Sequence, residues 1–117
     1  MVNPQLSKPG AGRRPLVVGN WKMNGTRASS VQLLSALRSA EPFDSDVSVC
    51  VPFPYLGEVA LTLQGSRITW GAQDCSHLEP GAHTGDVAAV MLADFGCRHV
   101  IVGHSERRVH HAESDQR

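Results

Sequence analysis

Short apolar runs alternate along this chain with segments in which apolar residues recur at helical spacing. The apolar runs are rich in β-branched residues and predict buried strands at residues 16–21, 46–51, 68–72 and 98–103. Strands that are separated by helices pair in parallel through right-handed crossovers. The order β-α-β-α-β-α-β therefore predicts an α/β fold built on a parallel sheet.

The segments between the strands predict three helices, each with one apolar face. The expected faces are Val31, Leu34 and Leu37 for the first helix, Leu56, Val59, Ala60 and Leu63 for the second, and Val87, Val90, Met91 and Phe95 for the third. Ser29 and Ser30 are suited to cap the first helix, because serine oxygens accept hydrogen bonds from the free amides of a first turn. Pro54 suits the first turn of the second helix, and Gly65 is expected to end it.

Composition limits the class of protein. The chain has 117 residues, of which 41% are hydrophobic, so one domain with one modest core is expected. Residues 1–14 are expected to be a disordered tail, and residues 15–117 the domain. The 11 basic and 11 acidic residues balance, which argues against a nucleic-acid or membrane partner. Cys50, Cys75 and Cys97 are far apart in the chain and predict a reducing, cytoplasmic location.

The candidate chemistry follows two of the predicted strands. Asn20 and Lys22 come at the end of the first, and His104 comes directly after the fourth. Parallel sheets carry their sites beyond the carboxyl ends of the strands. Side chains alternate between the two faces of a strand, and the residues that share a face are expected to be Val18, Asn20 and Lys22 on the first strand and Val100, Val102 and His104 on the fourth. The ammonium and the imidazole are therefore expected to polarise one anionic substrate from two sides.

Several motifs together resemble the triosephosphate isomerase family. They are Gly19-Asn20-Trp21-Lys22-Met23-Asn24-Gly25, Pro54-Tyr55-Leu56, Gly71-Ala72-Gln73-Asp74, Gly81-Ala82-His83-Thr84-Gly85-Asp86, Gly103-His104-Ser105-Glu106-Arg107-Arg108 and Glu113-Ser114-Asp115. They occur in the family's order, which makes a chance match implausible. The resemblance implies the N-terminal half, about four β/α units, of an eight-stranded parallel β/α barrel (a TIM barrel).

The resemblance also implies an isomerase that interconverts dihydroxyacetone phosphate and glyceraldehyde 3-phosphate through an enediolate, as in glycolysis and gluconeogenesis. It implies neither a cofactor nor a metal. Asn20 and Lys22 would bind the substrate, and His104 would polarise the carbonyl as negative charge develops on its oxygen. Glu106 would support the catalytic Lys22 as its ion-pair partner. The resemblance further implies that the histidine is kept neutral by a helix N-terminus, and Ser105 could open such a helical turn.

The loop at residues 73–86 is expected to form a homodimer contact. It is polar, rich in glycine and too long for an ordinary α/β connection. The resemblance implies that Thr84, within this loop, reaches into the active site of the partner subunit.

Three interpretations of the chain remain open. A barrel of this kind runs to about 250 residues, and no segment here resembles the one that carries the family's glutamate base, so a truncated barrel that is inactive alone is expected. A non-catalytic half-barrel that acts only as an association or complementation module is the alternative, because parallel edges invite association. A metal site is a third hypothesis, although its spacing matches no standard pattern, and its ligands would be His104, His110, His111 and Glu113.

Overall fold

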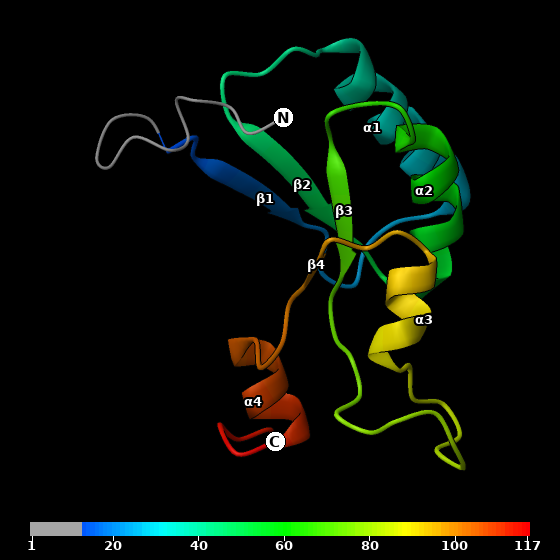
Figure 1. The fold of residues 1–117 in the computed structure, drawn as a ribbon, viewed down its shortest axis with the longest axis vertical. Coiled ribbons are helices and arrows are strands. Elements are labelled where there is room, and N and C mark those ends of the chain that lie inside the picture. Colours follow the sequence, from blue (N-terminus) through cyan, green and yellow to red (C-terminus); the bar gives the residue numbers. More distant parts are fainter. Residues whose placement is uncertain (1–12) are drawn as a thin grey trace.

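A four-stranded parallel sheet with the order β1-β2-β3-β4 is the frame of residues 13–117, which the computed structural model describes (Figure 1). The strands are β1 (Leu16–Asn20), β2 (Asp46–Cys50), β3 (Thr69–Ala72) and β4 (His99–Val100). The helices are α1 (Arg27–Ser39), the 3-10 turn η1 (Phe53–Tyr55), α2 (Leu56–Leu63), α3 (Ala89–Asp94) and α4 (Ser105–His111). The predicted α/β alternation and the parallel pairing are confirmed. The tail predicted at residues 1–14 lies mostly outside the described residues and stays a prediction.

The hydrophobic core lies between the sheet and the helices α1 and α2, which pack side by side (Figure 1). Its buried residues are Leu34, Val49, Val51, Leu56, Val59, Leu63, Ile68, Ala72 and Leu92. Three of the four apolar positions predicted for α2 are among them, so that prediction is confirmed. In α1, Leu34 is buried and Leu37 packs against the core, whereas Val31 is exposed.

The strand register brings the carboxyl ends of all four strands to one edge of the sheet. Asn20 pairs with Cys50, Cys50 pairs with Gly71, and Gly71 pairs with His99. A Cβ atom added at Gly71 would lie 2.2 Å from the carbonyl oxygen of His99, so only glycine lets β4 approach β3 this closely. The strand ends therefore converge where the sequence placed the candidate chemistry.

The cap of α1 differs from the prediction. Thr26, rather than Ser29 or Ser30, is the N-cap, and its Oγ1 accepts a hydrogen bond from the backbone N–H of Ser29. The hydroxyl of Ser29 in turn accepts from the backbone N–H of Thr26, which completes a capping box. Ser30 is buried and donates to the carbonyl of Thr26. The reciprocal pair satisfies two free amides at once, which a single serine cap does not.

The fourth strand is shorter than predicted, and its faces are reversed. Its last sheet hydrogen bond runs from Ile101 N–H to the carbonyl of Ala72, and Gly103 then turns the chain with a φ of +57°. His99 pairs with Gly71, which lies in the same row of the sheet as Asn20. Ile101, two residues further along the chain, therefore lies on the same face as Asn20. The expectation that Val100 and Val102 share this face was wrong, and Val102 is exposed.

The apolar face predicted for α3 was wrong at three of its four positions, whereas Val87, ahead of the helix, does pack against the core. The helix begins only at Ala89, and Leu92 is its buried residue. Val90, Met91 and Phe95, which were expected to face inward, are exposed. Nearly every position of this short helix is apolar, so periodicity could not identify the buried face. Gly96, with a φ of +77°, does follow the helix end.

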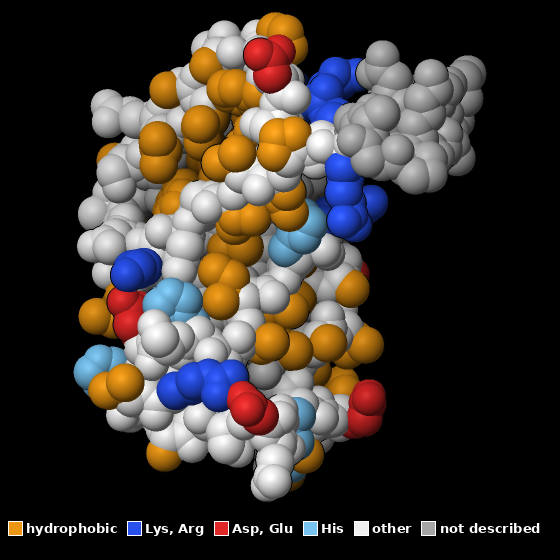
Figure 2. Space-filling view, turned by 90° about the vertical axis from the view of Figure 1, so that its left-hand side faces the viewer, with side chains coloured by type: hydrophobic (Ala, Val, Ile, Leu, Met, Phe, Trp, Pro, Cys, Tyr) orange, Lys and Arg blue, Asp and Glu red, His pale blue; other side chains and the backbone are white. Residues whose placement is uncertain are grey.

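The β1 side of the molecule carries a broad hydrophobic area (Figure 2). Leu16, Val17 and Val18 are 50%, 54% and 42% exposed, although they lie on both faces of a strand. In a parallel α/β sheet such residues are normally covered on both sides. Among the described residues, no helix is long and apolar enough to cross a membrane.

Candidate active site

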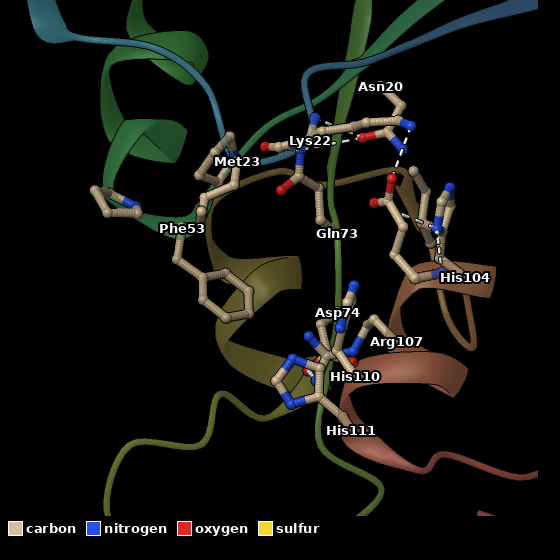
Figure 3. Close-up of a pocket in the computed structure, with 14 residues that line it drawn as sticks. Asn20, Lys22, Met23, Phe53, Gln73, Asp74, His104, Arg107, His110 and His111 are labelled. Carbon is tan, nitrogen blue, oxygen red and sulfur yellow. Dashed lines mark hydrogen bonds and ion pairs between the residues drawn. The ribbon is translucent and has the colours of Figure 1, made fainter.

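A cleft of about 550 Å³ opens at the carboxyl ends of the strands (Figure 3). Met23 and Phe53 lie on one side of it and His104 on the other. Its lining comes from the segments that follow each strand and includes Asn20, Lys22, Pro52, Gln73, Asp74, Ile101, His104, Glu106, Arg107, His110 and His111. The structure therefore brings Asn20, Lys22, His104 and Glu106 to one site.

Lys22 reaches this cleft through an unusual backbone conformation. Its φ is +54°, in the left-handed region that side chains with a Cβ rarely adopt. The Oδ1 atom of Asn20 accepts a hydrogen bond from the backbone N–H of Lys22 at 2.9 Å. The side chain of Asn20 thus stabilises the turn that directs the ammonium group toward the cleft.

Gln73 holds the same turn from the end of β3. Its Nε2 donates to Oδ1 of Asn20 at 3.2 Å, to the carbonyl of Lys22 at 2.9 Å and to the carbonyl of Cys50 at 3.1 Å. One amide therefore connects the segments that follow three neighbouring strands. This role of Gln73 was not predicted from the sequence, which placed the residue only in a motif and at the start of the 73–86 loop. The available signal was its position just after a strand, which matches that of Lys22.

Glu106 and Lys22 form an ion pair at the mouth of the cleft. Nζ of Lys22 lies 2.8 Å from Oε1 of Glu106, and both side chains are about half exposed. This hydrogen bond lowers the pKa of the Glu106 carboxyl below its ordinary value, and the positive charge of Lys22 lowers it further. The Glu106 carboxyl is therefore ionised at neutral pH.

His104 is the N-cap residue of α4. Its Nδ1 accepts a hydrogen bond from the backbone N–H of Glu106 at 3.1 Å, which assigns Nδ1 as an unprotonated acceptor. A neutral ring then carries its proton on Nε2, where it is available as a donor. The helical turn expected after His104 is present, because α4 begins at Ser105.

Arg107 connects α4 to the end of β3 and to the segment that follows the helix. Its guanidinium lies 3.0 Å from Oδ2 of Asp74 and 3.0 Å from Oε2 of Glu113. The Glu113 side chain is only 8% exposed, so Arg107 neutralises a nearly buried carboxylate. Arg107 and Asp74 were predicted only as parts of motifs, and Glu113 also as a ligand of the hypothetical metal site.

The remaining predicted residues do not form the sites expected of them. Thr84 is exposed on the loop that projects from the base formed by Ser76 and Ala88, and it does not line the cleft. His110 and His111 line the cleft, but Glu113 is paired with Arg107. Within residues 13–117, no three His, Cys, Asp or Glu side chains are grouped closely enough to hold a metal ion. The metal-site hypothesis therefore has no ligand set in the described part of the chain.

Comparisons with known proteins point to one family. A family model described as "Triosephosphate isomerase" matches residues 15–117. The triosephosphate isomerase of Bordetella pertussis is 60% identical over 105 residues, which are 89% of this chain and 42% of the relative. That of Nitrosococcus oceani is 56% identical over 105 residues (88% and 42%), and that of Cupriavidus pinatubonensis is 52% identical over 103 residues (88% and 42%). The chain thus spans less than half the length of these curated relatives.

Proposed function

Because this chain belongs to the triosephosphate isomerase family and forms the N-terminal half of its barrel, we propose that the cleft is one half of an isomerase active site. The reaction interconverts dihydroxyacetone phosphate and glyceraldehyde 3-phosphate. One observation carries the proposal: Lys22 and His104 share one cleft, and Glu106 contacts both, through its carboxylate to Nζ of Lys22 and through its backbone N–H to Nδ1 of His104.

The chemistry requires a proton to leave the carbon next to a carbonyl, so negative charge develops on the carbonyl oxygen. Preorganised donors lower the free energy of this enediolate-like transition state. Nε2–H of His104 supplies a neutral donor, as a neutral imidazole does in the triosephosphate isomerase family. Lys22 supplies the positive charge. The base that removes the proton comes from the part of the intact protein that follows these residues.

Asn20 binds substrate beside Lys22. Its Oδ1 already accepts hydrogen bonds from Lys22 and Gln73, so the amide orientation is fixed. The two N–H groups of its Nδ2 are then the groups that face a ligand as donors. A phosphorylated substrate offers the oxygen acceptors that such donors and an ammonium recognise.

The intact protein acts as a homodimer, with the loop at residues 73–86 as a contact. The backbone N–H of Ser76 donates to the carbonyl of Val87 at 2.8 Å, which closes the base of this loop. Residues 77–86 beyond it are exposed, Thr84 among them. An exposed loop on a closed base is suited to insertion into a second subunit. Three free cysteines are in keeping with the cytoplasm as its location.

The test uses a completed protein, in which this chain is joined to the C-terminal segment with which the Bordetella pertussis relative continues. We expect it to turn over both triose phosphates, and we expect a chelator to leave the rate unchanged. Absence of turnover in a folded completed protein, or loss of turnover with the chelator, would contradict the proposal.

The exposed β1 strand favours a second function, that of a non-catalytic association module. The two functions differ in one measurement. If the chain binds the separately produced C-terminal segment and turnover appears, the isomerase function holds. If the two bind tightly without turnover, the association function is the correct one.

A further inference from the structure

Helix α4 carries His104 and Glu106 at its N-terminus, yet hydrophobic packing does not hold it. No residue of α4 is buried in the described part of the chain, and its apolar residue Val109 is 77% exposed. In Figure 1 the helix stands apart from α1 and α2, beyond the end of the sheet. Polar contacts must therefore place it.

Two ion pairs connect α4 to the sheet, and they come from neighbouring residues. Glu106 pairs with Lys22 after β1, as described above. Arg107, the half-buried residue of the helix, pairs with Asp74 after β3 at 3.0 Å. The close-up shows Asp74 and Arg107 side by side below Gln73 (Figure 3). A helix attached at one point can pivot about it, whereas two points fix its direction.

The residues that follow β3 hold in place both segments that bring charged groups to the cleft. Gln73 holds the turn of Lys22, and the next residue, Asp74, holds the helix that begins at His104. We propose that Arg107 is a positioning residue, whose ion pair with Asp74 sets the placement of His104 and Glu106 relative to Lys22. The expected change in kinetic constants rests on the proposed function, whereas the expected change in the placement of α4 does not.

The choice of variant follows from the second partner of Arg107. Removing the arginine would leave the nearly buried Glu113 carboxylate with Arg117, 4.0 Å away, in place of its 3.0 Å ion pair, which endangers folding. Asp74→Ala removes only the connection to β3, because Arg107 keeps Glu113. Asp115→Ala is the matched control, since it removes an aspartate that pairs with Arg108 of the same helix but does not line the cleft.

The experiment compares these variants in the completed protein. Asp74→Ala should lower kcat on the order of tenfold, as expected when a catalytic group is displaced by a fraction of an ångström, and should change KM less. Asp74→Asn, which keeps an acceptor for Arg107, should recover part of the loss. Asp115→Ala should leave both constants unchanged.

A second measurement does not depend on turnover. Asp74→Ala should accelerate hydrogen exchange at the Glu106 amide and shift the ¹⁵N resonance of His104 Nδ1, because that hydrogen bond depends on the position of α4. Unchanged resonance and exchange in Asp74→Ala, or equal changes in Asp115→Ala, would overturn the positioning role. If the parent protein lacks turnover while these signals respond as expected, the proposed function fails and the positioning role stands.

Discussion

Nζ of Lys22 lies 2.8 Å from Oε1 of Glu106, although 84 positions separate the two residues in the chain. Lys22 follows the first strand of the sheet and Glu106 follows the last. The pair therefore joins the two ends of the described sheet across the mouth of the cleft. Its strength determines how firmly α4 is attached to the turn that carries the ammonium group.

The pH dependence of this pair can be measured directly. The hydrogen bond from Lys22 lowers the pKa of Glu106 in the folded protein, so the stabilisation is present above the unfolded pKa. It is lost as the pH falls through the folded pKa. A ¹³C titration of the carboxyl should therefore give a midpoint below the ordinary glutamate value, and Lys22→Met should raise it. Equal midpoints in the two proteins would mean that Lys22 does not interact with the carboxylate in solution.

Kinetic constants should separate the roles of the lysine and the histidine in the completed protein. His104→Gln should lower kcat by about 10²–10³-fold with a smaller change in KM, because the imidazole is proposed to act on charge that develops in the transition state. Lys22→Ala should raise KM as well as lower kcat, since the ammonium also attracts the substrate. A His104→Gln enzyme with the parent kcat would remove this histidine from the mechanism.

Gln73 should prove important for stability. Gln73→Glu keeps the shape of the side chain but replaces its donors with a carboxylate, which faces the acceptors of Asn20, Lys22 and Cys50. We expect a loss of about 1–3 kcal/mol in the free energy of unfolding, measured with urea. Gln32→Glu, on the exposed side of α1, is the matched control and should change little. Equal losses in both variants would show that the Gln73 hydrogen bonds are not the cause.

The dimer contact can be tested by shortening the loop. Replacing residues 78–85 with a short Gly-Ser link leaves the Ser76–Ala88 bridge in place. Sedimentation of the completed protein should then show monomers where the parent shows dimers. A dimer that survives this deletion would locate the interface elsewhere.

Residues 1–117 alone should be inactive and should associate. General-base catalysis contributes about 10²–10⁴-fold, and the described residues offer Glu106, already paired with Lys22, as the carboxylate nearest to His104. Leu16, Val17 and Val102 are exposed, which favours association. An assay for isomerase activity and sedimentation at several concentrations test both statements. A monomer with near-normal turnover would contradict them.

The sequence pattern alone predicted those elements whose structure depends on residues close together in the chain. The buried face of α2 followed from Leu56, Val59 and Leu63, because one helical period brings them together. The strands followed from their β-branched runs. The cleft at the strand ends followed from the topology rule for parallel sheets, although the binding roles of its residues stay predictions.

Other features depended on contacts that the sequence does not display. The inward face of β4 is set by the pairing of Gly71 with His99 and by the turn at Gly103, so parity along the strand gave the wrong result for Val100 and Val102. The pair of Arg107 and Asp74 arises only once α4 and the end of β3 lie next to each other. In the sequence, the charge of neither residue distinguishes it from a charged residue that is exposed to solvent.

The left-handed backbone of Lys22 has a consequence for the evolution of this chain. A residue with a Cβ atom in that conformation lowers the free energy of unfolding by about 1–3 kcal/mol. Glycine at this position would restore that stability, and asparagine would restore part of it. Neither replacement carries the ammonium. A library selected for thermal stability alone should therefore enrich glycine and asparagine at position 22, whereas one selected for turnover should return lysine. Opposite outcomes of the two selections would show that lysine is retained at position 22 for its ammonium group, although the backbone conformation there is unfavourable for it.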